Sequence, residues 1–162
     1  MVEKTTKKVR ESMKEDKVRE KKKNKMVMYN IAESNKEESE DRIKEDKEKC
    51  KEIIEGILGV RDSDIQQVIR LGKKQENTSR PRPLLIKLKE EKIKHLVLKR
   101  AKKLKDEREE KYRKVFINRD MTPQEMEEEK KLVEELKTRR RNGEEGWFIK
   151  NGKLQREERQ RS

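Results

Sequence analysis

Residues 65–88 read IQQVIRLGKKQENTSRPRPLLIKL and hold two short apolar runs on either side of a polar loop. The first run, Ile65 to Leu71, and the second, Leu84 to Leu88, each have the length and composition of a β-strand. Pro81 and Pro83 precede the second run, where they suit the entry of a strand and not its middle. We therefore predict two strands joined by a loop from Gly72 to Arg82.

A further strand is predicted before this pair, in the apolar run Met26-Val27-Met28-Tyr29-Asn30-Ile31. A helix follows it, starting near Ser34 or Ser39. Gly59 supplies a left-handed cap, and Val60 can fold back on the last turn. The apolar stripe of this helix consists of Ile43, Cys50, Ile53, Ile54, Ile57 and Leu58.

After the pair we predict a second helix and a fourth strand, Val115-Phe116-Ile117. One face of the second helix carries Ile93, Val97, Ala101 and Leu104.

A third helix has a strong start signal, because Thr122 suits the N-cap, Pro123 the first turn and Glu125 a capping box. Gly143 ends this helix. Its stripe consists of Met126, Leu132, Val133 and Leu136. Trp147-Phe148-Ile149 and Leu154 flank Asn151-Gly152, which predicts a small hairpin with a type I′ turn.

The predicted order is βαββαβ, followed by a helix and a hairpin. Each βα half is too small to bury its own stripe, so together they should form an α+β, ferredoxin-like sandwich with both helices on one sheet face. The other face stays open, and RNA-recognition motifs bind single strands on that face. The predicted parts are a charged arm at 1–25, an RRM-like domain at 26–121 and a C-terminal helix, hairpin and basic tail at 122–162.

The arm allows two interpretations. Val2, Thr5, Val9 and Ser12 follow the steps of a heptad, as at the end of a coiled coil, but only two of them are apolar. The alternative is a solvated basic segment.

Composition restricts the class of partner. Charged residues make up 51% of the chain and hydrophobic ones 28%, so any core must be local. The net charge of +13 favours a polyanion, with nucleic acid first and an anionic membrane surface second. No apolar run approaches the roughly 20 residues of a spanning helix, and the first residues do not resemble a signal peptide. The lone Cys50 fits a reducing compartment, so we expect a cytoplasmic or nuclear protein.

The chemistry-bearing residues do not predict an enzyme. His95 lies beside a helix stripe, and Cys50 lies on one, where it behaves as a small hydrophobe. The sequence has no Cys/His cluster for zinc and no phosphate-binding glycine loop. Asp and Glu interleave with Lys, as on solvated helix faces. We expect no catalytic site, no metal and no cofactor.

The first strand departs from RNA-recognition signatures. With Asn30-Ile31 aligned, Val27 stands where an aromatic is expected, and Tyr29 falls on the same face two residues later. Pro83 and Leu85 replace the two stacking aromatics of the third strand, and Lys87 extends that face. We therefore expect binding mainly through phosphate contacts.

Two basic clusters could supply those contacts. The first brackets the loop between the second and third strands, and the second occupies the last turn of the third helix. The predicted binding residues are Arg70, Lys73, Lys74, Arg80, Arg82, Lys87, Tyr29, Arg139, Arg140 and Arg141.

Four segments resemble the first-open-reading-frame protein of LINE-type retrotransposons. They read NKMVMYNIAE (24–33), VIRLGKK (68–74), SRPRPLLIKL (79–88) and VFINRDMTPQE (115–125), and the resemblance covers about 24–154. It implies an RRM-like domain, a small C-terminal domain, and self-association through an N-terminal coiled coil in a longer form. It also implies coating of RNA, nucleic-acid chaperone activity and RNA contacts from Arg70, Arg80 and Arg82. The sequence thus predicts a sequence-tolerant binder of single-stranded RNA or DNA, and the alternative is a charged-helix scaffold for protein partners.

Overall fold

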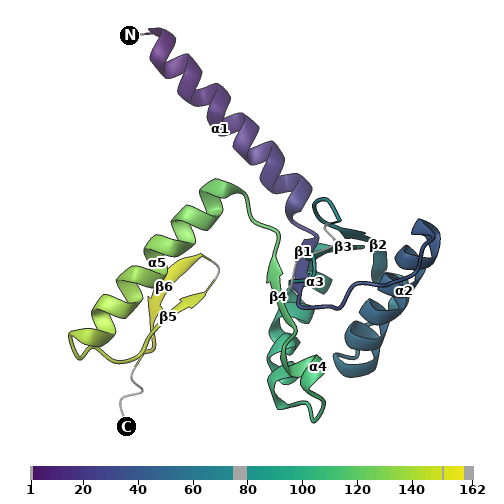
Figure 1. The fold of residues 1–162 in the computed structure, drawn as a ribbon. Coiled ribbons are helices and arrows are strands. Elements are labelled where there is room, and N and C mark those ends of the chain that lie inside the picture. The colour runs from purple at the N-terminus through teal and green to yellow at the C-terminus, as the bar shows by residue number, and fades with distance from the viewer. Residues whose placement is uncertain (1, 75–79, 151, 159–162) are drawn as a thin grey trace. The chain divides into compact units, whose positions relative to one another are not determined.

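The computed structural model describes residues 2–74, 80–150 and 152–158. The chain divides into two compact units, Met1–Asp120 and Met121–Ser162. Both units combine helices with antiparallel strands (Figure 1).

The first unit is built on a four-stranded antiparallel sheet. Its strands are β1 (Lys25–Tyr29), β2 (Ile65–Arg70), β3 (Leu84–Leu88) and β4 (Phe116–Arg119), in the spatial order β2-β3-β1-β4. β1 pairs with both β3 and β4, and β2 pairs with β3, which leaves β2 and β4 at the edges. All four strands lie where the apolar runs of the sequence predict them.

Two helices of this unit cover one face of the sheet. They are α2 (Ser39–Lys51), which continues into the π-helical segment η1 (Glu52–Ile57), and α3 (Glu91–Arg100), which continues into the 3-10 turn η3 (Ala101–Asp106). Short elements complete the unit, namely η2 (Asp62–Asp64) and α4 (Glu110–Arg113). The core combines Met26, Met28, Val68, Leu84, Ile86 and Leu88 from the strands with Cys50, Ile53, Ile54, Leu58, Val97 and Leu104 from the helices.

The burial pattern of β3 fixes which face is open. Leu84, Ile86 and Leu88 are fully buried beneath the helices, whereas Leu85 and Lys87 alternate with them and are half-buried. The predicted orientation of this strand is therefore confirmed. It follows from the two-residue period of side chains along a strand.

The end of the first helix also agrees with the sequence. Gly59 has a φ of +70°, a conformation that glycine adopts without the steric cost of a Cβ. The amide of Val60 donates to the carbonyl of Ile54, so the chain folds back and Val60 is buried. The sequence did not predict the π-helical segment, which holds Ile53 and Ile54 in the core.

Ile43 corrects the predicted stripe, because it is 48% exposed. It lines a shallow groove beside the edge strand β2 together with Ile69. The buried position one turn further along α2 is taken by Asp46, which is paired with Arg70.

The N-terminal segment forms a helix, α1 (Val2–Lys22). Its side chains at Val9 and Met13 are exposed, and Lys22 pairs with Asp120 at 3.1 Å. The side chain of Val2, part of the predicted heptad, lies outside the described residues. A helix agrees with the coiled-coil interpretation, while association with a second chain stays a prediction.

The second unit consists of α5 (Pro123–Arg141) and a hairpin of β5 (Trp147–Lys150) and β6 (Lys153–Arg156). Thr122 and Glu125 form the predicted capping box. Gly152 has a φ of +70°, but the predicted type I′ turn includes residue 151, which lies outside the described residues.

Met126 corrects the predicted stripe of α5, because its side chain is 51% exposed. A helix of 19 residues is about 28 Å long, whereas a strand of 4 residues is about 13 Å long. The hairpin therefore covers only part of α5. Leu132, Val133 and Leu136 are the half-buried residues of that helix stripe.

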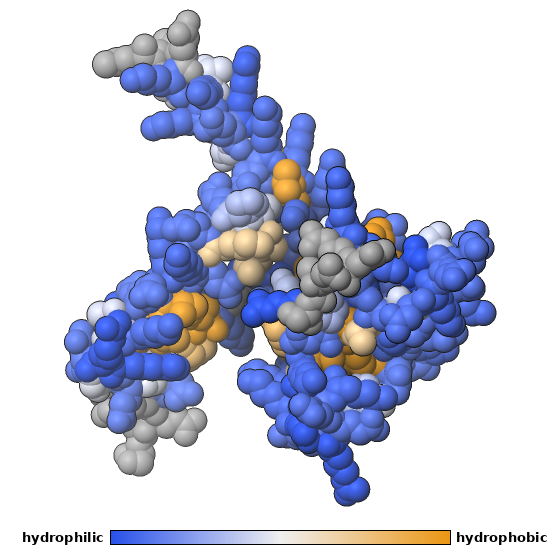
Figure 2. All heavy atoms as spheres, viewed as in Figure 1, coloured by the Kyte–Doolittle hydropathy of each residue, from blue (hydrophilic) through white to orange (hydrophobic). Residues whose placement is uncertain are grey.

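Hydrophilic residues dominate the face of the molecule shown in Figure 2, with apolar residues in small separate patches. Within the described residues, no helix is both long and apolar enough to cross a membrane.

Candidate functional site

The face of the sheet opposite the helices carries an unusual set of side chains. Strand alternation and register place nine residues there: Lys25, Val27, Tyr29, Gln67, Ile69, Leu85, Lys87, Phe116 and Asn118. We call this set the open sheet face. The four strands contain no Asp or Glu at all, although the whole chain has 35 acidic residues. The strand positions of this face therefore carry no acid. Directly after β4 comes the carboxylate of Asp120, whose amide donates to the carbonyl of Lys25 and whose side chain pairs with Lys22 at 3.1 Å.

Two aromatic rings stack on the open sheet face. Tyr29 of β1 and Phe116 of β4 are register partners, and their ring centroids lie 4.5 Å apart with an interplanar angle of 11°. The side chain of Phe116 is 51% exposed. Tyr29 is one of the predicted binding residues, whereas Phe116 is not. Strand alternation could have placed Phe116, because Ile117, its neighbour in β4, packs against the core.

Two lysines lie directly opposite each other on the same face. Lys25 of β1 and Lys87 of β3 are register partners, and neither forms an ion pair within the described residues. Like charges at directly opposite positions of a sheet are destabilising. A bound anion would relieve that repulsion. The sequence predicted Lys87 and missed Lys25, although Lys25 precedes Val27 by two residues and so shares its face.

Arg70 lies at the end of β2, on the helix-facing side of the sheet. Its guanidinium forms an ion pair with Asp46 of α2 at 2.9 Å, and both side chains are only 8% exposed. Nε and Nη2 donate to the two carboxylate oxygens of Asp46. The remaining N–H groups donate to the carbonyls of Ile31, Ala32 and Arg82.

These five hydrogen bonds engage all five donors that a guanidinium has. Arg70 therefore has none left for a phosphate, and its role in this geometry is to join strands and helix. The signal was present in the sequence, since Val68 and Arg70 share a face by alternation.

Arg82 closes the base of the basic loop. Its Nε donates to Glu33 at 2.7 Å, and its Nη1 donates to the carbonyl of Gly72 at 3.0 Å. The amide of Leu71 also donates to the carbonyl of Pro83. The two ends of the loop are therefore held together. Lys73, Lys74 and Arg80 project from it as exposed residues, and 75–79 lie outside the described residues.

The Glu33–Arg82 pair predicts an acid-sensitive part of the stability. Burial would raise the pKa of Glu33, but the hydrogen bonds and charge of Arg82 outweigh it and lower the pKa below the ordinary 4.5. A lowered folded-state pKa contributes stability that is present above the unfolded value and is lost as pH falls through the folded value.

We therefore expect Glu33→Gln to lower the melting temperature at neutral pH and to flatten its fall between about pH 5 and pH 3. Thermal unfolding followed by circular dichroism measures this. The control is Glu48→Gln, which removes an exposed carboxylate from α2. In this variant the melting temperature should fall with falling pH as steeply as in the parent. If the melting temperature of Glu33→Gln fell equally steeply, the Glu33–Arg82 pair would not be the source of the acid sensitivity.

The second predicted cluster lies in the smaller unit. The Arg139 guanidinium lies 4.1 Å from the centroid of the Trp147 ring, and it pairs with Glu135 at 2.9 Å and Glu144 at 3.5 Å. Arg139 thus serves to pack helix against hairpin. Arg140 and Arg141 are exposed, so of the three they are the ones placed to meet a ligand.

Cys50 and His95 do not gain a catalytic environment. Burial raises the pKa of the Cys50 thiol to about 12, so the nucleophilic thiolate is absent at neutral pH. His95 is exposed and contacts Glu91 of its own helix. In the described part of the chain, no three His, Cys, Asp or Glu side chains are grouped to hold a metal.

The chain matches no protein-family model and no curated protein. Its functional assignment therefore rests on its own residues and their geometry.

Proposed function

We propose that the chain is a non-catalytic, sequence-tolerant binder of single-stranded RNA or DNA. The observation that carries the proposal is the open sheet face. There the stacked pair of half-buried Tyr29 and exposed Phe116 shares a surface with Lys25 and Lys87, neither of which forms an ion pair within the described residues, and none of the strand positions is acidic. Aromatic rings can stack on the bases of any sequence, and lysines bind phosphates without reading bases.

The strand order supports an RRM-like, ferredoxin-like identity for the first unit. In that fold the two outer strands flank a central antiparallel pair and both helices lie on one face, as β2-β3-β1-β4 and the core do in this chain. RNA-recognition motifs bind single strands on the uncovered face. On this proposal, the chain derives from a LINE-type retrotransposon and acts as a nucleic-acid chaperone or ribonucleoprotein component, in the cytoplasm or nucleus.

The basic loop extends the proposed interface beyond the sheet. Lys73, Lys74 and Arg80 are exposed, and within the described residues two of the five N–H donors of Arg82 are engaged. Arg140 and Arg141 would add phosphate contacts from the second unit. Arg70 and Arg139 support the structure in this proposal and do not touch the ligand.

The test replaces both lysines of the face, Lys25→Gln together with Lys87→Gln. We expect log affinity for single-stranded RNA to depend on log salt with a slope flatter by about 1.4, because each lost phosphate contact removes about 0.7. Stability should stay equal or rise, because the like-charge pair is gone. Filter binding at several salt concentrations and a melting curve measure the two effects.

The matched control is Lys44→Gln with Lys47→Gln, which removes the same charge from the exposed side of α2. This variant should keep the slope of the parent. If the parent bound RNA with no salt dependence, or if both variants behaved alike, the open sheet face would not be the interface.

A second candidate is a scaffold that binds protein partners through charged helices. The exposed Val9 and Met13 of α1 favour it, because they lie four residues apart on one side of a helix. In that case RNA binding would be absent or independent of salt.

A further inference from the structure

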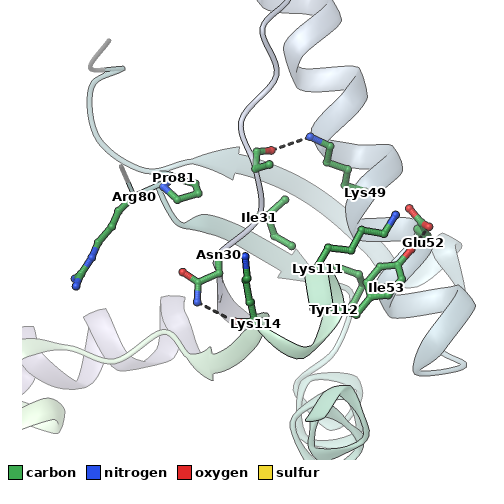
Figure 3. Close-up of a pocket in the computed structure, with 11 residues that line it drawn as sticks. Asn30, Ile31, Lys49, Glu52, Ile53, Arg80, Pro81, Lys111, Tyr112 and Lys114 are labelled. Atoms are coloured by element: carbon green, nitrogen blue, oxygen red, sulfur yellow. Dashed lines mark hydrogen bonds between the residues drawn. The ribbon is translucent and has the colours of Figure 1, made fainter. Parts of the chain in front are cut away.

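A pocket of about 440 Å³ lies in the first unit, beyond the last residue of β1 (Figure 3). Four segments line it: the residues after β1, the junction of α2 with η1, α4 and the end of the basic loop. Arg80 lies at one end of it and Tyr112 with Glu52 at the other, while Asn30 and Ile31 lie between. Its volume falls within the range of about 300–1,000 Å³ that is typical of sites for small ligands.

The walls suit a flat, partly apolar group. Ile31 and Ile53 belong to the buried core, and Tyr112 packs against that core and adds its ring. The Tyr112 hydroxyl donates to the Glu52 carboxylate, which fixes the orientation of the ring. The pocket is therefore formed before any ligand arrives, which lowers the entropic cost of binding.

Positive charge lies around these walls. Lys111, Lys114 and Arg80 line the pocket and are exposed. Lys111 pairs with Glu109 at 3.3 Å, and Lys114 pairs with Glu110 at 3.7 Å, both on the surface. Exposed ion pairs contribute little, so a phosphate can replace either carboxylate at small cost.

The pocket adjoins the open sheet face along the chain. Asn30 directly follows Tyr29, and its φ of +67° turns the backbone at the end of β1. The Asn30 side-chain amide donates to the carbonyl of Lys114 at 2.8 Å, which ties this turn to the segment leading into Phe116. A single strand of nucleic acid that stacks on Tyr29 and Phe116 therefore lies next to Asn30 and Lys114, which line the pocket.

We propose that this pocket accepts one unstacked base of a bound single strand, with the phosphate of that nucleotide on Lys111 and Lys114. The inference rests on the proposed function and deepens it, because it turns a flat surface into an interface with one enclosed nucleotide position. A flat heterocycle can lie in the pocket against the Tyr112 ring and the aliphatic wall. Lys111, whose Nζ lies 4.8 Å from the centroid of that ring, and Lys114 are then placed beside it to meet its phosphate.

The main test compares an oligouridine of about 16 nucleotides with an abasic strand of the same length, which keeps the phosphates and lacks the bases. Tyr112→Ala should weaken binding of the oligouridine about tenfold and leave the abasic strand unaffected, because stacking on one base is lost. Tyr112→Phe keeps the ring but loses its bond to Glu52, so it should bind the abasic strand as the parent does and bind the oligouridine clearly more tightly than Tyr112→Ala does. Lys111→Gln with Lys114→Gln should weaken binding of both strands and flatten the salt slope by about 0.7, because one phosphate contact is lost.

A measurement on the parent needs no variant that might lose its fold. Irradiation of the complex with 5-iodouridine RNA should attach uridine to the peptide that contains Tyr112. The inference would be overturned if every crosslink mapped to other peptides. It would also be overturned if Tyr112→Ala, with an unchanged melting curve, lost affinity for the oligouridine and the abasic strand equally.

Competition with uridine monophosphate tests whether the pocket binds a nucleotide within an RNA strand or a free nucleotide. At millimolar concentration it should compete only weakly with the oligouridine, because it lacks the contacts of the neighbouring nucleotides. The inference would be overturned if the mononucleotide bound tightly and Tyr112→Ala weakened its binding but not the binding of RNA. The pocket would then be a site for a free nucleotide. If RNA binding depended steeply on salt but had the same affinity in the parent and in all pocket variants, the pocket inference would fail and the proposed function would stand. Absence of RNA binding by the parent would instead refute the proposed function.

Discussion

Replacing Arg70 with alanine is expected to lower the free energy of unfolding of the first unit by about 3–5 kcal/mol. The substitution leaves the buried Asp46 carboxylate without its ion-pair partner, and three backbone carbonyls lose a donor. A loss of this size lowers the melting temperature by at least about 10 °C in a small domain. Chemical denaturation and thermal unfolding measure it.

Two further variants separate the charge from the geometry. Arg70→Met combined with Asp46→Leu removes both charges and should recover much of the loss, because a buried ion pair can often be replaced by packed apolar groups. Arg70→Lys keeps the charge but lacks the planar five-donor fork, so it should remain clearly less stable than the parent. Wild-type stability in Arg70→Ala would show that the pair is not buried in solution. Arg82→Ala is the control for the neighbouring loop, and it should cost less because Glu33 can turn to water.

Replacing Ile86 with aspartate is expected to abolish folding of the first unit. Ile86 is fully buried at the centre of the sheet, between Met26 of β1 and Val68 of β2. An unpaired buried charge costs several kcal/mol, and loss of the isoleucine packing costs about 2–5 kcal/mol more. Together these terms approach the 5–15 kcal/mol that stabilises a typical domain.

Leu85→Asp is the matched control, because it places the same charge one residue away on the open sheet face. That variant should stay folded and should bind RNA less well, since it brings an acid among strand positions that have none. The measurement is circular dichroism with a melting curve. If Leu85→Asp unfolded the unit and Ile86→Asp did not, the two faces of β3 would be the reverse of those described.

Local patterns in the sequence were sufficient to place the four strands of the sheet, the two helices that cover it, α5 and the hairpin, whereas η1, η2 and α4 were not predicted. Pro81 and Pro83 mark the start of β3, and Thr122 with Glu125 marks the start of α5, because the physical reasons for those residues are local. Periodicity also gave the core positions of β3.

Periodicity alone could not say where a stripe stops meeting its partner. Ile43 and Met126 follow the helical period, but their side chains are 48% and 51% exposed, so neither is covered by the sheet or hairpin that its helix packs on.

The candidate site was less accessible from the sequence, because a charged residue near a loop has the same local signature whatever it contacts. Arg70, Arg80 and Arg82 all looked alike, yet one is enclosed, one is exposed and one ties the loop ends together. The partner that distinguishes Arg70 is 24 residues away, on another element. Phe116 and Lys25, by contrast, follow from strand alternation once the register of β1 with its neighbours is known.

The five bonds of Arg70 also have a consequence for the timing of folding and unfolding. They join segments that are 12, 24, 38 and 39 residues apart in the chain. Contacts between distant segments require loop closure, and the planar five-bond geometry also requires β2, the helix and the loop to be in place together. We therefore predict that this network assembles after the transition state. Interactions that form late slow unfolding and leave the folding rate almost unchanged. Arg70 should therefore slow unfolding and prolong the lifetime of the native state.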